Sequence, residues 1–384
     1  MLTSMSYEKP YAGLKVLEIS QGYAGPYCAM MLAQYGAEVI KIEPPGGDWM
    51  RIIGKQAGDH TAHSIIANIG KKSLALDLKA PEGREIAQRL AADCDVLVEA
   101  ARPGVAERLG LSYDLVRSRN PGVVYMSVSG FGQEGPYADR PCTDSVTQSF
   151  SGLMSVNLGL DDGMPHRVGC LIVDHLTGIY AFQAVAAALY ARRDEAEGRF
   201  LDISLMHSMA SMLAPKIAEH HLEDGNPRAL NAPTGSYRTK DGWIALALVK
   251  EEQWPRLCAA IGRPEYIDDP RFTDFESRAE HLEDLLPMIR DAIAERTTDD
   301  WGKRLRDADI LANRINDFGE WLADEQVQAA NAAPMLTQPN AGPTPIVHIP
   351  GTAALQDGDA RSKAPPIGAD SREILSGLGL DEAA

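Results

Sequence analysis

The carboxylate of Asp174 stands alone in a long apolar stretch of the sequence. It lies near the start of a predicted helix over Ile172–Arg193 and is the only acidic residue between Asp162 and Asp194. A carboxylate beside a helix N-terminus stays ionised, and an ionised, partly desolvated carboxylate can act as a nucleophile or a base. The same place also suits a helix N-cap, which would stabilise the fold by about 1 kcal/mol without any chemistry. The residue alone leaves both interpretations open.

A second candidate is the glycine-rich run Gly130-Phe-Gly-Gln-Glu-Gly135, which matches the GxGxxG pattern of dinucleotide-binding turns. It follows a predicted strand, as that fingerprint requires. However, Pro136 and then Asp139-Arg140-Pro141 stand where a helix would have to receive the pyrophosphate. The run also follows the fifth predicted strand rather than the first. We therefore expect no NAD, and we interpret the run as a glycine-rich loop of the active site.

The other reactive side chains lack the partners that chemistry would require. No base evidently accompanies Cys170, so we expect a buried structural cysteine there. The pair His220-His221 has no acidic or cysteine partner at ligand spacing, and we expect no metal site. The five cysteines show no CxxC spacing, which argues against a disulfide framework and predicts a reducing compartment, the cytoplasm.

The charge of the chain narrows its range of partners. Its formal net charge is −17 at pH 7. An acidic surface repels nucleic acid and anionic lipid, so we expect neither a nucleic acid nor a membrane as partner, and a polyanionic ligand would need a local basic pocket. The loops after the early predicted strands hold six cations that could form a phosphate-binding mouth: Lys41, Arg51, Lys71, Lys72, Arg102 and Arg108.

These side chains need elements to hold them, and the first half of the chain alternates strand-like and helix-like segments. Short β-branched runs predict strands at 14–20, 38–43, 73–78, 95–99, 123–129 and 200–205. Helices are predicted at 26–35, 81–92, 113–119, 146–154 and 172–193. This alternation favours βαβ units around a mostly parallel sheet, an α/β fold whose ligands bind in the loops after the strands.

The second half is organised differently. The stretch 225–235, rich in glycine, asparagine and proline, is typical of a linker, and beyond it a hairpin over Ser236–Leu248 and several helices predict a smaller α+β domain. A strand is predicted at 345–349. We therefore divide the chain into a large domain (1–222), a small domain (223–330) and a C-terminal segment (331–384).

Several short motifs occur in order along roughly the first 210 residues. They are Leu14-Lys-Val-Leu-Glu-Ile-Ser20 with Ala24-Gly-Pro26, Gly36–Glu43, Asn68 with Lys71-Lys-Ser73, Leu76–Lys79 with Pro81-Glu-Gly83, Asp95–Glu99, Val128–Gly132 with Gly135-Pro-Tyr137, Asp144, Asp174–Gly178 and Gly198–Ser204. In order and spacing they resemble the class III CoA-transferases, the family of formyl-CoA transferase, carnitine CoA-transferase and the α-methylacyl-CoA racemases.

The resemblance implies a large Rossmann-like domain that binds coenzyme A, a small domain, and a C-terminal segment that returns to the large domain. It also implies a homodimer of ring-like subunits that interlock like chain links. Asp174 falls on the catalytic aspartate of the family. It would carry coenzyme A from an acyl-CoA to a small carboxylic acid through an acyl–aspartyl anhydride and an aspartyl–CoA thioester. Neither substrate has to lose a proton, so no adjacent base is needed.

Such a site must stabilise oxyanions, and the loss of one donor typically costs about 10²–10³ in rate. Our candidate donors are backbone N–H groups of two loops: Gly22, Tyr23 and Ala24, and Gly130, Gly132 and Gly135. Tyr23 stands where formyl-CoA transferase has a glutamine. We group Asp144 with the six cations as residues that bind coenzyme A.

The racemase branch is the main alternative, because it needs two acid/base groups on opposite faces of a carbon atom. In that branch the second group is a histidine immediately before the counterpart of Asp144. Here the position holds Thr143, which cannot exchange a proton near neutral pH and so disfavours racemisation. A non-catalytic CoA-thioester binder is a further alternative. Four arginines could pair with a second substrate carboxylate, which favours dicarboxylic acids: Arg51, Arg102, Arg140 and Arg167.

Overall fold

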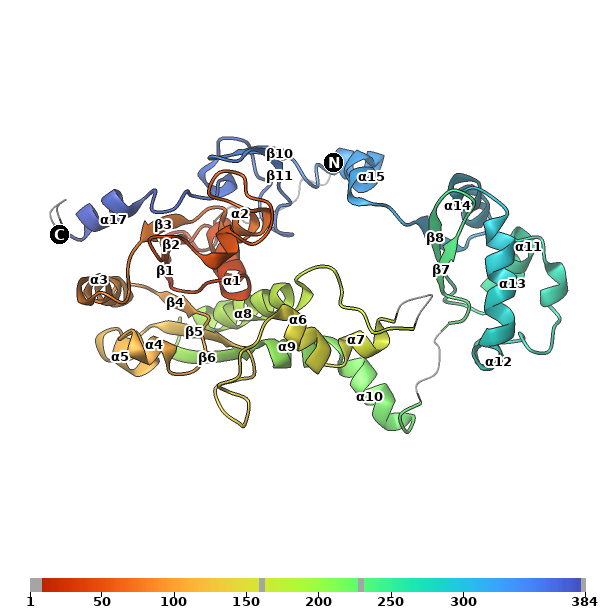
Figure 1. Ribbon diagram of the computed structural model, residues 1–384, viewed down its shortest axis with the longest axis horizontal. Coiled ribbons are helices and arrows are strands. Elements are labelled where there is room, and N and C mark those ends of the chain that lie inside the picture. Colours follow the sequence, from red (N-terminus) through yellow and green to blue (C-terminus); the bar gives the residue numbers. More distant parts are fainter. Residues whose placement is uncertain (1–8, 159–162, 227–230, 381–384) are drawn as a thin grey trace. The chain divides into compact units, whose positions relative to one another are not determined.

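Six parallel strands form the main sheet of the structure, a computed structural model that describes residues 9–158, 163–226 and 231–380 (Figure 1). Their order across the sheet is β3-β2-β1-β4-β5-β6, which is that of dinucleotide-binding Rossmann folds. The predicted α/β fold with a parallel sheet is confirmed. The strands are β1 (Lys15–Glu18), β2 (Glu38–Glu43), β3 (Lys72–Ala75), β4 (Val96–Glu99), β5 (Val124–Ser129) and β6 (Arg199–Ser204).

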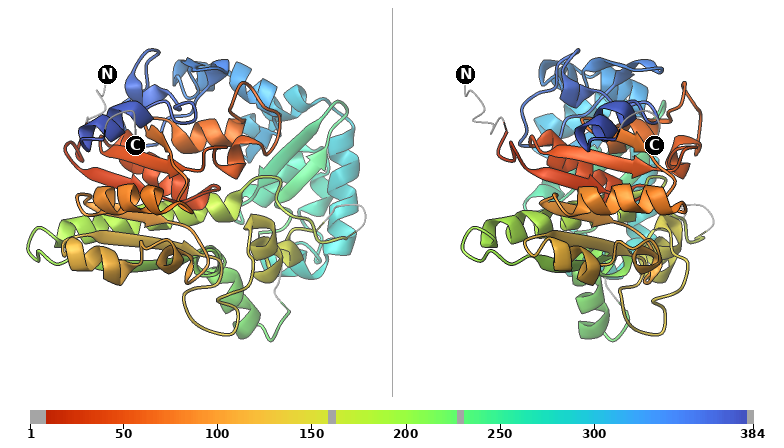
Figure 2. Two further views of the ribbon diagram at one scale, coloured as in Figure 1. Left: turned by 60° about the vertical axis from the view of Figure 1, so that its left-hand side comes forward. Right: turned by 90° about the vertical axis from the view of Figure 1, so that its left-hand side faces the viewer.

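Helices cover both faces of this sheet (Figures 1 and 2). On one face, Leu32 of α1 and Val185 of α8 belong to one hydrophobic core. On the other, Ala87 of α3 and Ile374 of α17 belong to a second core. Coverage on both sides explains why β4 and β5 are buried at every residue and lack the alternation of buried and exposed positions that a half-exposed sheet shows. The helices of this part are α1 (Ala24–Gln34), α2 (Ala62–Asn68), α3 (Pro81–Ala91), α4 (Val105–Arg108), α5 (Tyr113–Arg119), α6 (Asp144–Phe150), α7 (Leu153–Val156), α8 (Ile172–Ala191), α9 (Leu205–Met212) and α17 (Ser371–Gly377).

Helix α8 is the long apolar helix that the sequence predicts. Among the described helices it alone has the length and composition to cross a membrane. One face packs against α1 and the sheet in the core, so burial inside the protein accounts for the apolar residues of that face. The prediction of a single helix over 146–154 is wrong. Helix α6 ends before Gly152, whose φ of +86° breaks the helical path ahead of α7.

The chain divides into two compact units. One consists of the chain up to Pro215 together with the segment from Asn331 onward, and the other is Lys216–Ala330. The first division falls within α10 (Ala214–Leu222). Residues 227–230 of the predicted linker lie outside the described residues. The predicted hairpin is present as β7 and β8, to which β9 adds a third antiparallel strand. The elements here are β7 (Gly235–Arg238), β8 (Trp243–Ala247), α11 (Gln253–Ala260), α12 (Phe275–Glu280), α13 (Leu282–Ala294), α14 (Thr298–Asp307), β9 (Leu311–Arg314), α15 (Phe318–Ala323) and α16 (Glu325–Ala329).

The segment from Asn331 onward is fastened to the sheet near β3. Its hairpin consists of β10 (Met335–Gln338) and β11 (Gly342–Pro345), so the strand predicted at 345–349 is wrong: residues up to Pro345 pair, and those after it leave the ladder. Downstream of the hairpin, the backbone N–H of Ser73 donates to Asp370 (2.8 Å), and Ser73 Oγ accepts from the N–H of Gly368 (2.8 Å).

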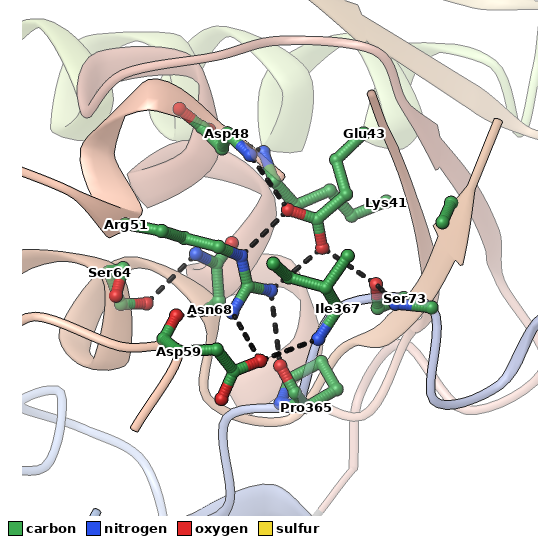
Figure 3. Close-up of polar contacts among 12 residues, drawn as sticks. Lys41, Glu43, Asp48, Arg51, Asp59, Ser64, Asn68, Ser73, Pro365 and Ile367 are labelled. Atoms are coloured by element: carbon green, nitrogen blue, oxygen red, sulfur yellow. Dashed lines mark hydrogen bonds and ion pairs between the residues drawn. The ribbon is translucent and has the colours of Figure 1, made fainter. Parts of the chain in front are cut away.

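A buried arginine joins this segment to the loop after β2. Figure 3 shows the Glu43 carboxylate between the Arg51 guanidinium and the Ser73 hydroxyl. Arg51 donates from Nε and Nη2 to the two Glu43 oxygens, at 2.7 Å each, and from Nη2 to the Pro365 carbonyl at 3.1 Å. Arg51 thus holds β2, the loop after β2 and the returning segment together.

A second buried ion pair lies beside the first. The Glu18 carboxylate at the end of β1 accepts from Lys41 Nζ at 2.8 Å and from Lys71 Nζ at 2.6 Å. Burial alone would raise the pKa of Glu18, but the two ammonium groups outweigh burial and hold that pKa below its usual range. Glu18 therefore stays ionised, and the ends of β1 and β2 are tied to the chain at β3.

We predict that Arg51→Met lowers the free energy of unfolding by about 3–5 kcal/mol, because Glu43 would remain buried without its cation. The matched control is Arg117→Met, which breaks a solvent-exposed pair with Glu197 and should cost at most about 1 kcal/mol. Chemical denaturation of the three proteins measures both effects. Equal losses in the two variants would contradict the structural role given to Arg51.

Candidate active site

Two cavities open at the carboxyl edge of the sheet, beside the point between β1 and β4 where the strand order reverses. Rossmann-type sheets bind their ligands at this place. The cavities have volumes of about 640 and 330 Å³, and we call them the larger and the smaller cavity. Gln21, Trp49, Ala100 and Ala101 line both, so the two are adjoining chambers of one recess.

Asp174 lines the smaller cavity from the first turn of α8. The N-cap interpretation is wrong, because Asp174 is the third residue of the helix and Leu171 is the N-cap residue. The capping oxygen comes from Asp144, whose Oδ2 accepts from the N–H groups of Val173 (2.8 Å) and Asp174 (3.2 Å). Asp144 thereby fixes the turn that carries Asp174.

The prediction that Asp144 binds coenzyme A does not fit this position. Its side chain is buried, and its other oxygen accepts from Gln148 Nε2 at 2.6 Å. Gln148 in turn accepts from the N–H of Val168 at 2.8 Å. The Asp144 carboxylate is fully engaged with protein groups, so it positions Asp174 instead of meeting a ligand.

The carboxyl group of Asp174 has an unusual acidity. Burial raises its pKa to about 7, and the negative charge of Asp144 raises it as well. We expected the helix N-terminus to keep Asp174 ionised, but burial and Asp144 outweigh the helix dipole. Near neutral pH the group is therefore divided between its two forms, and the ionised form is poorly solvated. Perturbed carboxyls of this kind mark candidate catalytic groups.

Helix α1 begins at the same cavity, where Tyr23 and Ala24 form part of the lining. The first N–H groups of a helix lack acceptors within it, and in α1 these belong to Ala24 and Gly25. The close approach of α1 to α8 depends on Gly178, because a Cβ there would lie 2.9 Å from the Ala24 carbonyl oxygen. Two helix N-termini therefore meet at one cavity. The described residues supply no hydrogen-bond acceptor to the N–H groups of Ala24 and Gly25 at the start of α1.

Gly22 was predicted to be an oxyanion donor, and the structure corrects this. Its N–H donates to the Asp48 carboxylate at 3.1 and 3.2 Å, so the group is already engaged. Gly22 has a φ of +84°, and a Cβ would come within 2.8 Å of the Trp49 ring. Asp48 pairs in turn with Lys41 at 3.0 Å. Gly22 and Asp48 therefore fix the wall between the two cavities.

Of the three glycines predicted in the second loop, only Gly130 lines the smaller cavity. It has to be glycine, because a Cβ would lie 2.3 Å from Cβ of Cys142. Gly132 and Gly135 lie outside the lining, and the N–H of Gly132 donates to Ser129 Oγ at 3.0 Å. The prediction that Gly132 and Gly135 stabilise an oxyanion is therefore not supported by their positions.

Four of the six predicted phosphate ligands are committed to protein carboxylates, which is a correction. Lys41, Lys71 and Arg51 are buried in the ion pairs described above. Lys72 begins β3, at the opposite edge of the sheet, and pairs with Glu38 and Glu373. A cation already paired in the interior, or on the far edge, cannot meet a phosphate in the recess.

The two remaining cations, Arg102 and Arg108, are exposed. Arg102 lines the smaller cavity. Arg108 ends α4, whose residues Val105 and Ala106 line the larger cavity. Lys79 also lines the larger cavity, although sequence reasoning did not select it.

Sequence reasoning also missed Trp49, which lines both cavities. A single aromatic residue in a loop carries no periodic signal. The Pro44-Pro-Gly-Gly47 turn before it was the available cue. Cys170, expected to be buried, is exposed. Among the described residues no group of three potential metal ligands comes together.

Comparisons with known proteins agree with this geometry. A model of CoA-transferase family III matches residues 11–371. The succinyl-CoA–D-citramalate CoA-transferase of Chloroflexus aurantiacus is 32% identical, over 99% of this chain and 97% of its own. The (R)-2-hydroxy-4-methylpentanoate CoA-transferase of Clostridioides difficile is 29% identical, over 96% of each. A crystal structure of a CaiB/BaiF family protein from Brucella suis superposes with a TM-score of 0.84 at 29% identity, over 97% of this chain and 100% of its own.

We predict that Asp174→Asn stabilises the protein at pH 8. The folded protein holds the Asp174 proton up to about pH 7, whereas an unfolded aspartate loses it near pH 4. The free energy of unfolding of the wild type should therefore fall as the pH rises from about 4 to 7. The asparagine variant lacks the titrating carboxyl group and should not show this contribution. The gain at pH 8 is at most about 4 kcal/mol, since one pKa unit corresponds to about 1.4 kcal/mol.

Chemical denaturation at pH 4 and pH 8 measures this difference, and Asp139→Asn, at an exposed loop carboxylate, is the control. The gain should be confined to Asp174→Asn and should nearly disappear at pH 4. An asparagine variant that is no more stable than the wild type at pH 8 would contradict the proposed desolvation of Asp174.

Proposed function

The chain belongs to CoA-transferase family III and is an enzyme of that family, and we propose that it transfers coenzyme A through a covalent intermediate on Asp174. Its substrates would be an acyl-CoA thioester and a small carboxylic acid. One observation carries this proposal: a desolvated carboxylate lines a cavity together with the N-terminus of a helix. Ligand cavities typically measure about 300–1,000 Å³, and the adjoining larger cavity, at about 640 Å³, falls in that range.

In the first half of the reaction an Asp174 oxygen attacks the thioester carbonyl carbon. A C–O bond forms, the C–S bond breaks, and the coenzyme A thiolate leaves an acyl–aspartyl anhydride. The thiolate then attacks the side-chain carbonyl of Asp174, so that a C–S bond forms and the donor acid departs as a carboxylate. Asp174 now carries coenzyme A as a thioester.

The second half runs these steps in reverse with the acceptor. Its carboxylate attacks the Asp174 thioester and releases the thiolate, which then attacks the acceptor carbonyl. This step yields the new acyl-CoA and restores the Asp174 carboxylate. No proton moves in any step, so the reaction requires no general base. Desolvation raises the energy of the attacking carboxylate and thereby favours its reaction.

Each attack forms an oxyanion, and the start of α1 can stabilise it. The N–H groups of Ala24 and Gly25 are the first donors of that helix, and the helix dipole favours negative charge at its N-terminus. Tyr23 is the N-cap residue beside them. Burial raises the pKa of its hydroxyl above the usual range, so the hydroxyl stays protonated and can donate.

We propose that the larger cavity holds part of coenzyme A. It adjoins the smaller cavity along Trp49 and Ala100, which would let a thioester reach Asp174. Lys79 lines it, and Arg108 and Arg102 stand near its walls. These exposed cations are suited to phosphate groups, whereas Lys41, Arg51 and Lys71 are not.

Racemisation finds no support in the lining of the smaller cavity. Thr143 lies there, where the racemase branch has its histidine. Apart from the two arginines, the titratable residues that line this cavity with Asp174 are Cys142 and Tyr23, and burial raises the pKa of both groups. Neither would be a base near neutral pH. His175 follows Asp174 in α8 but lies outside the lining. The second acid/base group that racemisation requires is therefore missing from the described lining.

We further propose that the chain forms a homodimer and works in the cytoplasm. Large apolar side chains remain exposed on neighbouring helices of the first unit, among them Ile179 and Tyr190 of α8 and Met212 of α9. Exposed apolar surface of this kind often marks a protein interface. Interlocking of the two subunits rests on the family resemblance. All five cysteines are free, which suits a reducing compartment.

We predict that Asp174→Ala and Asp174→Asn each lower the rate of CoA transfer by at least about three orders of magnitude, because no other group would form the intermediate. Mass spectrometry of an acyl-CoA mixed with carboxylic acids measures the transfer. Hydroxylamine added during turnover should convert Asp174 of the wild type to a hydroxamate, detectable by peptide mapping.

Asp139→Asn is the matched control, since it removes an exposed carboxylate from a nearby loop, and it should keep the wild-type rate. Transfer that persists in Asp174→Asn, with no hydroxamate at Asp174 in the wild type, would refute the proposed intermediate. A racemase would instead incorporate solvent deuterium at the α-carbon without any acceptor acid.

We predict that kcat/KM for the acyl-CoA rises with pH around a midpoint near 7, because only the ionised Asp174 attacks. Asp144→Asn keeps an oxygen for the N–H groups of Val173 and Asp174 but removes a negative charge. The pKa of Asp174 should fall, so the midpoint should move to lower pH. An unchanged or higher midpoint would show that Asp144 does not tune Asp174.

A further inference from the structure

Three neighbouring strands of the sheet, β2, β1 and β4, each end in a glutamate at the recess. The carboxylates of Glu18 and Glu43 face the buried cations described above. Glu99 ends β4 and is also buried, but within the described part of the chain no lysine or arginine forms an ion pair with it. Of these three glutamates, only Glu99 is therefore left by the protein without a compensating cation.

The described residues that bond to Glu99 all donate to it. Ser127 Oγ donates to Oε1 of Glu99, and the backbone N–H of Ala101 also donates to the carboxyl group. Gln133 Nε2 donates to Ser127 Oγ at 2.9 Å, so the hydroxyl proton of Ser127 is directed toward Glu99. Donors of this kind favour the ionised form of a carboxyl group.

The second oxygen of Glu99, Oε2, has space for one more donor. No described residue bonds to it, and it is not one of the fully enclosed side-chain atoms without a partner, so it borders open space. Glu99 lines the larger cavity and also a cavity of about 290 Å³, which we call the side cavity. Ala100 and Ala101, the next residues along the chain, line both the larger and the smaller cavity. Glu99 therefore stands beside the boundary between the larger cavity and the cavity of Asp174.

The part of coenzyme A that would cross this boundary is its pantetheine arm, because the thioester lies at the end of that arm. The arm is uncharged and carries two amide N–H groups and a hydroxyl group. The phosphates lie at the other end of the coenzyme, where the exposed cations Lys79 and Arg108 suit them. An unpaired carboxylate repels a phosphate, but it forms a strong hydrogen bond with an amide N–H.

We propose that Glu99 binds coenzyme A as a carboxylate that accepts a hydrogen bond from an N–H group of the pantetheine arm, and that it releases a proton when the coenzyme binds. This inference rests on the proposed binding of coenzyme A in the larger cavity. Glu99 is then a binding residue that recognises the uncharged arm instead of the phosphates, and it takes no part in the bond changes at Asp174.

The acidity of Glu99 fits this coupling. Burial raises its pKa to about 7, and the negative charge of Asp202 on β6 raises it as well, against the two donors. A further donor at Oε2 would stabilise the carboxylate, so its pKa should fall when the arm binds, and the proton passes to solvent. The other charged or titratable groups around Glu99 are Arg102, Glu107, Tyr113, Asp114 and Tyr125 at the side cavity, and Glu43, Asp77 and Lys79 at the larger cavity.

The test measures coenzyme binding and proton release by isothermal titration calorimetry in buffers of different ionisation enthalpy. The parent protein is Asp174→Asn, which lacks the other carboxyl group of the recess with a pKa of about 7 and permits no turnover. Glu99→Gln in this parent removes the charge of Glu99. The matched control is Asp114→Asn, which removes an exposed charge from the side cavity. The ligands are coenzyme A and adenosine 3′,5′-bisphosphate, which carries phosphates but lacks the arm.

At pH 6 the binding of coenzyme A should release about one proton more from the parent than from Glu99→Gln, because Glu99 is mostly protonated there before binding. At pH 8 Glu99→Gln should weaken the binding of coenzyme A by about 10- to 100-fold, the usual effect of losing a hydrogen bond to a charged group. Its affinity for the bisphosphate should not change. Asp114→Asn should match the parent with both ligands.

Ser127→Ala in the same parent keeps the Glu99 side chain, so it tests the coupling even if Glu99→Gln does not fold. Loss of the Ser127 donor should raise the pKa of Glu99 in the free protein. Coenzyme binding at pH 8 should then release more protons than it does in the parent, and an unchanged release would contradict the inference.

Equal proton release at pH 6 from the parent and from Glu99→Gln would overturn the inference. Proton uptake by Glu99 would overturn it as well, because the group would then bind the coenzyme as a neutral acid. An equal loss of affinity for coenzyme A and for the bisphosphate would assign Glu99 to the phosphates, which also overturns it. These outcomes leave the transfer through Asp174 intact. If coenzyme A bound neither the wild type nor any variant, the proposed function would fail, and this inference with it.

Discussion

The Asp174 carboxylate is kept poorly solvated, and much of the surrounding structure follows from this constraint. A helix N-terminus would normally stabilise its charge through free N–H groups. Here Asp144 accepts from the N–H groups of Val173 and Asp174 itself, so the turn that carries Asp174 offers it little solvation. The donors that remain belong to the start of α1, which Gly178 allows to come close. Donors placed there can stabilise a charge that forms on the carbonyl oxygen of the substrate, two bonds from the attacking Asp174 oxygen.

The carboxylates near the recess differ in what surrounds them. Glu99, which lines the larger cavity, is buried and has a pKa raised by burial to about 7. Glu18, Glu43 and Asp48 each face a lysine or arginine. Among the described residues no cation forms an ion pair with Asp174, and burial and its acidic neighbour Asp144 both raise its pKa. A paired carboxylate fixes the backbone, because separating the pair leaves a buried charge uncompensated. An unpaired carboxylate is free to react. The paired groups also explain why the segment from Asn331 onward belongs to the site: the Pro365 carbonyl completes the partners of Arg51.

Local patterns predicted the fold and drew attention to Asp174, which the family resemblance then assigned to catalysis, and the errors of the sequence analysis concern long-range pairing. Alternating strands and helices are local features, as is a lone acid in an apolar helix. The sequence shows which residues are charged, but it does not show which distant residue pairs with each of them. Glu18, the partner of Lys71, lies 53 residues away, and Asp48, the acceptor for Gly22, lies 26 residues away. Lysines and arginines in loops after strands therefore looked like phosphate ligands, although most of them close the protein's own ion pairs. Asp144 looked like a ligand-binding acid for the same reason.

In the proposed cycle Asp174 alternates between a charged carboxylate and an uncharged thioester, and this change affects the order in which substrates bind. On the proposed mechanism, a free acid meets Asp174 either as a carboxylate or as a thioester. The negative charge of the Asp174 carboxylate repels the negative charge of an incoming acid, whereas the uncharged thioester does not. An acid with two negative charges feels this difference most, because Coulomb energies inside a partly desolvated cavity exceed those in water. The acid therefore binds best when coenzyme A is ready for transfer, and it is least able to occupy the cavity when an acyl-CoA must enter. Asp174 is esterified as a thioester in one half of the proposed cycle and free in the other. The same residue would thus form the covalent intermediate and determine the order in which the substrates bind.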